Sequence, residues 1–229
     1  FRRVLFRSDA CTVEGHAVRQ LYLATGIADV YLETGEEALL TTMHRLWEDM
    51  TYRKTYIHGG VGSIHNNEAF SEPYELPNSR AYCETCAQIA SIMWNWRLLM
   101  AGGNGVYADA MEDALYNAFL SGVSLTGDRY FYVNTLLSKG SDPVISRKRI
   151  QRLEWPWTPC CPPNVMRFLA VLDHYVATTG EAGLQLHHYM SSTIEAGIGA
   201  DTPVRLAVET DYPWNGTVRV VVENSPDTP

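Results

Sequence analysis

The residues whose types and spacing most clearly suggest chemistry are four cysteines in two tight groups. Cys83 and Cys86 enclose Glu84 in a CxxC motif, and Cys160 and Cys161 are adjacent much later in the chain. Together they could supply sulfur ligands to zinc, which in structural sites is usually tetrahedral with sulfur and nitrogen ligands. Small thiols packed in a core are the competing interpretation, because free cysteine is among the most buried residue types. A thioredoxin-like redox site fits less well, since no βαβ pattern surrounds the CxxC motif.

The position of these residues relative to helix starts decides whether they can share a metal ion. Residues two apart point to roughly opposite sides of a regular helix, so Glu84 and Cys86 could share an ion only where the chain is still extended before a helix. Pro162 and Pro163 suit the first turn of a helix, which puts Cys160 at a helix start as well. The positive end of a helix dipole favours thiolate there, and bound zinc would lower the thiol pKa further.

A long glycine-rich loop supplies a second group of candidates. It runs over Tyr56–Ser79 and contains Glu68 and His65. Long ordered loops in compact domains are commonly functional, so Glu68 could act as a general acid or base and His65 could reach a ligand. His16 lies in a helical pattern outside this loop, where a histidine taken by itself is more often structural.

Apolar residues recur every three or four positions through most of the chain, which predicts a mainly α-helical fold. The five predicted helices cover Thr12–Glu33, Glu36–Arg53, Arg80–Met100, Gly105–Ser121 and Pro163–Thr178. After Gly183 the apolar residues alternate with period two, which predicts antiparallel strands. The strands centre on Leu184–His188, Val204–Val208 and Val218–Val222, with turn signals at Gly197–Pro203 and Tyr212–Gly216. This change of pattern predicts a domain boundary near residues 179–184.

The composition is that of an ordinary folded domain, with 46% apolar and 19% charged residues. Its 18 basic and 26 acidic side chains give a formal charge of −8 without any basic run, so nucleic acid and anionic membranes are poor partners. The most apolar segment, Ala87–Met100, is broken by polar residues and is no membrane span. Residues 1–9 form an uncertain leader that lacks the apolar core of a signal peptide, so cytoplasmic and exported locations both stay open.

Five short motifs make the sequence resemble a known family. They are GGVGSIHNNEAF, LPN, AYCETC, GDRYFYVN and CCPPN, in this order. Together they are similar to the β-L-arabinofuranosidases of glycoside hydrolase family 127, and YPWNG resembles the first β-sandwich domain of that family. Two positions depart from the family pattern. Asn67 stands where the pattern has glycine, and Cys83 has no ligand role in it.

The resemblance implies a fold, an (α/α)6 barrel followed by β-sandwich domains. On this basis residues 10–182 are the C-terminal part of the catalytic barrel, and residues 183–229 are the start of a truncated β-sandwich domain. Five helices cannot close such a barrel. We therefore expect the chain to be part of a longer protein whose N-terminal helices lie outside it.

The resemblance also implies roles for individual residues. Glu84, Cys86, Cys160 and Cys161 match the zinc ligands of the family, and Cys160 also matches the nucleophile. Glu68 matches the general acid/base. The residues expected to contact the sugar are His16, Glu112 and Tyr132, to which the loop position adds His65.

These residues predict a retaining glycosidase that releases terminal β-L-arabinofuranosyl or related units from oligosaccharides derived from plant glycans. Retaining glycosidases normally use two carboxylates, and here a zinc-bound thiolate would replace the nucleophilic one. Two alternatives stay open. One is a carboxylate-only glycosidase that uses Glu68 and Glu84 and has structural cysteines, and the other is a non-catalytic, zinc-stabilised carbohydrate-binding fragment. Assembly into a homodimer is open as well.

Overall fold

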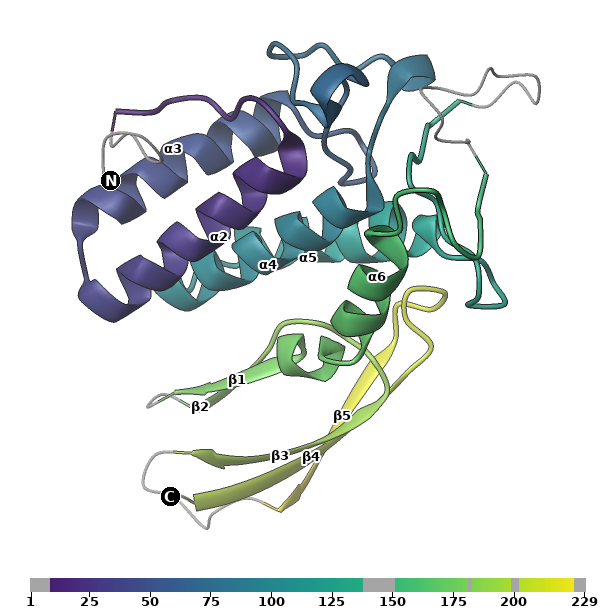
Figure 1. The fold of residues 1–229 in the computed structure, drawn as a ribbon. Coiled ribbons are helices and arrows are strands. Elements are labelled where there is room, and N and C mark those ends of the chain that lie inside the picture. The colour runs from purple at the N-terminus through teal and green to yellow at the C-terminus, as the bar shows by residue number, and fades with distance from the viewer. Residues whose placement is uncertain (1–8, 138–150, 181–182, 199–201, 225–229) are drawn as a thin grey trace. The chain divides into compact units, whose positions relative to one another are not determined.

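The computed structural model describes residues 9–137, 151–180, 183–198 and 202–224. The chain divides into two compact units, Phe1–Arg167 and Phe168–Pro229. The first unit is helical and the second consists mainly of antiparallel strands (Figure 1). The fold is therefore mainly α with two small antiparallel sheets, as the periodicity predicts. The predicted leader falls almost entirely outside the described residues, and the predicted boundary between residues 182 and 183 stays a prediction.

Among the described residues of the first unit, four α-helices precede α6 (Cys161–Leu169). They are α2 (Ala17–Thr34), α3 (Glu37–Arg53), α4 (Thr85–Gly102) and α5 (Val106–Asp113), and α5 continues into a π-helical turn over Ala114–Phe119. Helices α2 and α3 form a hairpin, α4 packs against α2, and α5 packs against α4 (Figure 1). In the described part of the chain, every helix is too short or too polar to span a bilayer. The core lies between α2, α3 and α4 and includes the fully buried Leu21, Met43, Leu46, Trp94 and Leu98.

Helix α3 agrees with its prediction, but α2 and α4 begin later than their apolar stripes suggest. Gly15 has a φ of 72°, which ends any helical continuation toward the N-terminus of α2. The residues before α4 are not helical, because Ala81 and Glu84 have ψ values of 119° and 133° and Cys83 has a φ of 40°. Both corrections have the same cause, because tertiary contacts hold these segments in non-helical conformations that periodicity cannot detect.

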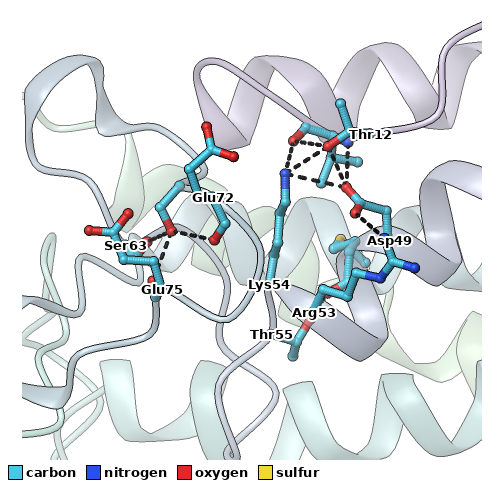
Figure 2. Close-up of polar contacts among 11 residues, drawn as sticks. Thr12, Asp49, Arg53, Lys54, Thr55, Ser63, Glu72 and Glu75 are labelled. Atoms are coloured by element: carbon cyan, nitrogen blue, oxygen red, sulfur yellow. Dashed lines mark hydrogen bonds and ion pairs between the residues drawn. The ribbon is translucent and has the colours of Figure 1, made fainter.

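A buried ion pair fixes the segment before α2. Asp49 and Lys54 are 4% and 5% exposed, and Lys54 Nζ lies 3.3 Å from Asp49 Oδ2. Asp49 Oδ2 accepts hydrogen bonds from Thr12 Oγ1 at 2.7 Å and from Val13 N at 2.9 Å. Lys54 Nζ donates to Thr12 Oγ1 and to Val13 O, each at 2.8 Å (Figure 2). Both buried charges are thus satisfied by the segment that leads to His16.

The glycine-rich loop packs on α4 through a single buried side chain. Gln88 is fully buried, accepts a hydrogen bond from Val61 N at 3.1 Å and donates to Val61 O at 3.4 Å. The carbonyl oxygen of the next residue, Gly62, accepts hydrogen bonds from the backbone N–H groups of Tyr82 and Cys83 at 3.1 and 2.9 Å. The loop and the CxxC segment therefore form one connected structure.

Helix α6 (Cys161–Leu169) begins in the first unit, and a 3-10 turn follows at Leu172–Tyr175. The second unit has a hairpin of β1 (Ala177–Gly180) and β2 (Gly183–Leu186), and a meander of β3 (Ser192–Ile198), β4 (Thr202–Thr210) and β5 (Val218–Asn224). Strands β4 and β5 were predicted correctly, but only β4 buries its alternating residues, since Val220 and Val222 of β5 are 43% and 57% exposed. The predicted helix over Pro163–Thr178 is too long, since β-branched Thr178 and Thr179 pair in β1 instead. The predicted turn at Gly197–Pro203 is too wide, because both its ends belong to strands.

We expect Lys54→Met to lower the free energy of unfolding by about 3 kcal/mol, because it leaves Asp49 buried without its cation. Arg53→Met is the matched control. Arg53 Nη1 lies 3.8 Å from the same carboxylate, but its side chain is 55% exposed, so its loss should cost less than about 0.5 kcal/mol. Urea unfolding of the full-length polypeptide, followed by tryptophan fluorescence, measures both. Equal effects of the two substitutions would contradict the assignment of a buried ion pair.

Candidate active site

Four of the predicted residues meet in one place. Glu84, Cys86, Cys160 and Cys161 offer ligand atoms that all lie within 4.8 Å of one another. Cys86 Sγ is 3.6 Å from Cys161 Sγ, which in turn is 3.8 Å from Cys160 Sγ. Glu84 Oε1 is 3.4 Å from Cys160 Sγ. The two thiol motifs, far apart in sequence, thus converge as a shared metal ion would require.

The start of α4 places Glu84 and Cys86 on the same side. Glu84 has a φ of −56° and a ψ of 133°, so it is extended and directly precedes the helix, while Cys86 belongs to the first turn. Thr85 anchors this start, because its N–H donates to Tyr132 O at 3.2 Å and its hydroxyl donates to Phe131 O at 2.8 Å. The extended geometry that a shared ion requires is thus present at Glu84, whereas Cys86 lies within the helix and not before it.

The start of α6 supplies the other two sulfurs. Cys161 is its first residue, Cys160 directly precedes it, and Asn164 N donates to Cys160 O at 3.3 Å. Pro162 and Pro163 occupy the first turn, where helical N–H groups have no intrahelical partner and a missing N–H costs little. Both sulfur pairs therefore lie at helix N-termini, as the sequence predicts.

Cys83 is outside the cluster although it shares the CxxC motif with Cys86. Its side chain is 1% exposed and packs with Tyr56 and Ala81. Burial raises the pKa of the Cys83 thiol. Because its φ of 40° turns the chain between Tyr82 and Glu84, this cysteine is a core residue and not a ligand.

The cluster concentrates negative charge on one sulfur. Hydrogen bonds from the Cys161 and Cys86 thiols hold the pKa of Cys160 at about 2, and the same contacts with Cys160 raise the pKa of the other two. Burial raises the pKa of Glu84 to about 10, and the neighbouring Cys160 sulfur acts in the same direction. Among the three clustered thiols, Cys160 is thus the one whose pKa is lowered by its neighbours.

The donor set suits a cation that binds thiolates. A tetrahedral ion with metal–sulfur distances of about 2.3 Å would hold its sulfurs about 3.8 Å apart, and the two sulfur separations are 3.6 and 3.8 Å. Glu84 Oε2 is buried and finds no hydrogen-bond donor among the described residues. Such an orphaned oxygen beside three sulfurs is expected where a metal ion completes the site.

Glu68 lies at the tip of a small hairpin next to this cluster. Ile64 N donates to Ala69 O at 3.0 Å, and Ala69 N donates to Ile64 O at 2.9 Å. Glu68 Oε2 accepts a hydrogen bond from the Tyr132 hydroxyl at 3.1 Å and lies 3.2 Å from His16 Nε2. The carboxylate is therefore held between two residues that come from different parts of the chain.

The backbone at the hairpin tip is strained. Asn67 and Glu68 have φ values of 58° and 53°, and the left-handed conformation costs an ordinary residue about 1 kcal/mol or more. Asparagine tolerates this conformation better than most residues, which explains how Asn67 can stand where the family pattern has glycine. Strain of this kind clusters at functional sites.

A cavity of about 610 Å³ opens between these groups. Its walls include Cys160, Glu68, His16 and Tyr132, all of them in the first unit. This volume is within the range of small-molecule sites. The arrangement places the Cys160 sulfur and the Glu68 carboxyl group on the wall of the same cavity.

The other two predicted sugar-binding residues lie elsewhere. His65 Nε2 is 3.1 Å from Arg80 O, and its ring packs edge-on against Tyr82. Glu112 lies in α5 near Tyr116, whose pKa is raised by burial and, after it, by Glu112. Neither His65 nor Glu112 is among the described residues that line the cavity. Their role in sugar binding stays a prediction.

The cavity also has polar walls that sequence reasoning missed. The amide of Asn164 contacts the Tyr22 hydroxyl, and Arg167 Nη2 donates to Asn164 Oδ1 at 2.9 Å. The sequence offered only a weak positional signal for one of them, since Asn164 follows Cys160 by four residues, about one helical turn. Tyr22 follows His16 by six residues, a spacing that does not place two residues on one helix face. Tyr22, Asn164 and Arg167 nevertheless all line the cavity.

The chain matches a family model described as the catalytic domain of β-L-arabinofuranosidase, GH127, over residues 3–174. It belongs to this family. The non-reducing end β-L-arabinofuranosidase of Bifidobacterium longum subsp. longum is 36% identical over 219 residues, which are 93% of this chain and 33% of that protein.

Solved structures of GH127 members agree with this assignment. The β-L-arabinofuranosidase of Geobacillus stearothermophilus T6 is 41% identical with a TM-score of 0.88, covering 94% of this chain and 34% of that chain. A GH127 β-arabinofuranosidase is 37% identical with a TM-score of 0.86, covering 94% and 32%. The chain spans about a third of the length of these GH127 relatives.

We expect Cys86→Ala to abolish thiolate-to-cobalt charge-transfer absorption when Co²⁺ is added to the metal-free protein, because it removes one of three sulfurs from the cluster. Cys83→Ala, in the same CxxC motif, should retain that absorption, since Cys83 lies outside the cluster. Titration of both variants with Co²⁺ provides the comparison. If the absorption depended on Cys83, the ligand set described above would be wrong.

Proposed function

We propose that this GH127 chain forms the C-terminal part of an (α/α)6 catalytic barrel, and the first strands of a β-sandwich domain, in a longer retaining glycoside hydrolase. The proposed reaction is release of terminal β-L-arabinofuranosyl or related units from oligosaccharides derived from plant glycans. One observation carries the proposal: Cys160 and Glu68 line the same cavity beside a thiol cluster that suits a metal ion. The names of the GH127 relatives support the choice of sugar.

Exposure favours Cys160 as the nucleophile among the three clustered thiols. Cys86 and Cys161 are 3% and 0% exposed, whereas Cys160 is partly exposed at the cavity wall. Zinc held by Glu84 and the three sulfurs would keep the thiols deprotonated at neutral pH. Cys86, Cys161 and Glu84 would then fix the position of the Cys160 sulfur, while that sulfur stays open to the substrate.

In the first step, the Cys160 sulfur attacks the anomeric carbon and the glycosidic carbon–oxygen bond breaks. Glu68 donates its proton to the departing oxygen, so the leaving group is an alcohol. The sugar is then bound to Cys160 through a carbon–sulfur bond. Two adjacent contacts support this role of Glu68, since His16 Nε2 and the Tyr132 hydroxyl both meet its Oε2 atom.

In the second step, Glu68 removes a proton from a water molecule whose oxygen attacks the same carbon. The carbon–sulfur bond breaks, the electron pair returns to Cys160, and Glu68 regains its proton. Two inversions at one carbon give net retention. His16 and Tyr132 would orient Glu68 in both steps, and Glu112 and His65 would contribute to sugar binding in the complete enzyme.

The carboxylate-only alternative is less well supported. It needs Glu84 as an ionised nucleophile, but this carboxyl is 3% exposed and burial raises its pKa to about 10. The non-catalytic alternative leaves unexplained why Glu68 is held in a strained conformation beside a cavity.

We expect Cys160→Ser to lower kcat/KM of the full-length polypeptide for 4-nitrophenyl β-L-arabinofuranoside by about three orders of magnitude or more, since a hydroxyl remains protonated where a thiol ionises. Cys11→Ser, at an exposed thiol, is the control and should leave the rate unchanged. Initial rates and the intact mass of the protein during turnover are the measurements. Near-normal turnover of the Cys160 variant would refute a thiolate nucleophile.

The role of Glu68 predicts a dependence on the leaving group. Glu68→Gln should lower kcat/KM for the methyl furanoside by about 10²-fold or more, because that alcohol departs only when protonated. The same substitution should lower kcat/KM for the nitrophenyl furanoside far less. Glu72→Gln, an exposed neighbour in the same loop, is the control for both substrates. An equal loss on the two substrates would remove Glu68 from the acid role.

A further inference from the structure

The strained hairpin tip that carries Glu68 needs a restraint, because residues in the left-handed region persist only where their surroundings hold them. Main-chain hydrogen bonds between Ile64 and Ala69 close the hairpin, and Phe70 N donates to Gly15 O at 2.9 Å. These bonds restrain the returning strand as far as Phe70, and Ser71 follows directly after them. A second restraint at this position would fix the tip.

A chain of buried hydroxyl groups meets that requirement. Ser63 and Ser71, at the two sides of the hairpin base, are each 7% exposed. The Ser63 hydroxyl donates to Ser71 Oγ, and the Ser71 hydroxyl donates to the backbone carbonyl of Glu75 at 2.8 Å. Figure 2 shows Ser63 beside Glu72 and Glu75, in the turn that follows the hairpin.

The turn is itself anchored to the helical core. Tyr74 N donates to Arg53 O, at the end of α3, at 2.7 Å. The hydroxyl chain therefore joins the hairpin base to a fixed point through Glu75, one residue further on. Because a hydrogen bond and the strain of a left-handed residue are energies of the same order, one such bond is enough to decide whether the tip keeps its conformation.

We propose that Ser63 and Ser71 are positioning residues, whose shared hydrogen bond holds Glu68 at the distance where it can protonate the leaving group. The inference rests on the proposed function, since it assigns these serines to the acid step. Neither serine is among the described residues that line the cavity. They act only through the hairpin, and the thiol cluster does not depend on them.

The test compares Ser63→Ala and Ser71→Ala in the full-length polypeptide, using the methyl and the 4-nitrophenyl β-L-arabinofuranosides. We expect kcat/KM for the methyl furanoside to fall by about tenfold or more in each variant, because general acid catalysis is worth at least that factor. For the nitrophenyl furanoside, which hardly needs the proton, we expect a change below about threefold. The ratio of the two values does not depend on the folded fraction, so a loss of stability cannot imitate the result.

Ser91→Ala is the matched control, because Ser91 is also a buried serine, 3% exposed, whose hydroxyl contacts Asn95 in α4. It should leave the ratio unchanged. The double variant Ser63→Ala with Ser71→Ala should lose no more than the larger single effect, since both act through one bond. Ser63→Ala keeps the bond between Ser71 and Glu75, so it provides the answer even where Ser71→Ala does not fold.

An equal loss on both substrates, or none on either, would overturn the assignment of these serines while leaving the proposed function standing. Failure of the unaltered protein to hydrolyse either furanoside would overturn the proposed function and this inference with it. Cobalt absorption of the serine variants is a further readout. It should match that of the unaltered protein, whereas its loss would show that the substitutions damage the thiol cluster and not the position of Glu68.

Discussion

Three thiols and one carboxylate share a space in which their polar atoms lie within 4.8 Å of one another, and three of the four residues are almost completely buried. Removing such groups from water costs several kcal/mol unless they are paired, so this arrangement is stable only if a cation is bound or the protons are shared. Within the cluster, the hydrogen bonds between the thiols lower the pKa of Cys160 and raise the pKa of Cys161. The close packing of these four residues therefore favours negative charge on the Cys160 sulfur.

The surrounding fold meets the geometric demands of that cluster at two helix starts. Helix α4 begins only at Thr85, so Glu84 stays extended and its side chain lies on the same side as that of Cys86. Helix α6 begins at Cys161 and has two prolines in its first turn. Periodicity predicted both helices, and proline placed the start of α6. Apolar periodicity could not place the end of the extended segment before α4, because that segment is fixed by hydrogen bonds to Tyr132 and Phe131, far away in the sequence.

The sequence predicted those parts of the candidate site whose chemistry follows directly from the residue type. The clustered thiols and acids were identified from the sequence, and Cys83 was identified as a thiol without a ligand role. The reason why Cys83 lies outside the cluster is its left-handed backbone and its packing against Tyr56, which only the tertiary structure reveals. Neutral residues such as Ser63 and Asn164 carry no comparable signal, because serine and asparagine are common in loops and at helix starts for purely local reasons. Their importance follows only from burial and from the partners that their polar atoms meet.

Two carboxylates in this site have opposite environments, and that difference separates their roles. Glu84 is almost fully buried among sulfurs and is suited to hold a cation, whereas Glu68 is 19% exposed at the cavity and meets a histidine and a tyrosine hydroxyl. Glu84 lies at a helix start with an unstrained φ of its own and follows the left-handed Cys83, while Glu68 itself has a left-handed backbone. A group that must transfer a proton has to meet the substrate at a defined distance, and a short restrained hairpin provides that precision without burying the carboxylate. The strain at Glu68 is thus the cost of holding an accessible acid beside a buried thiolate.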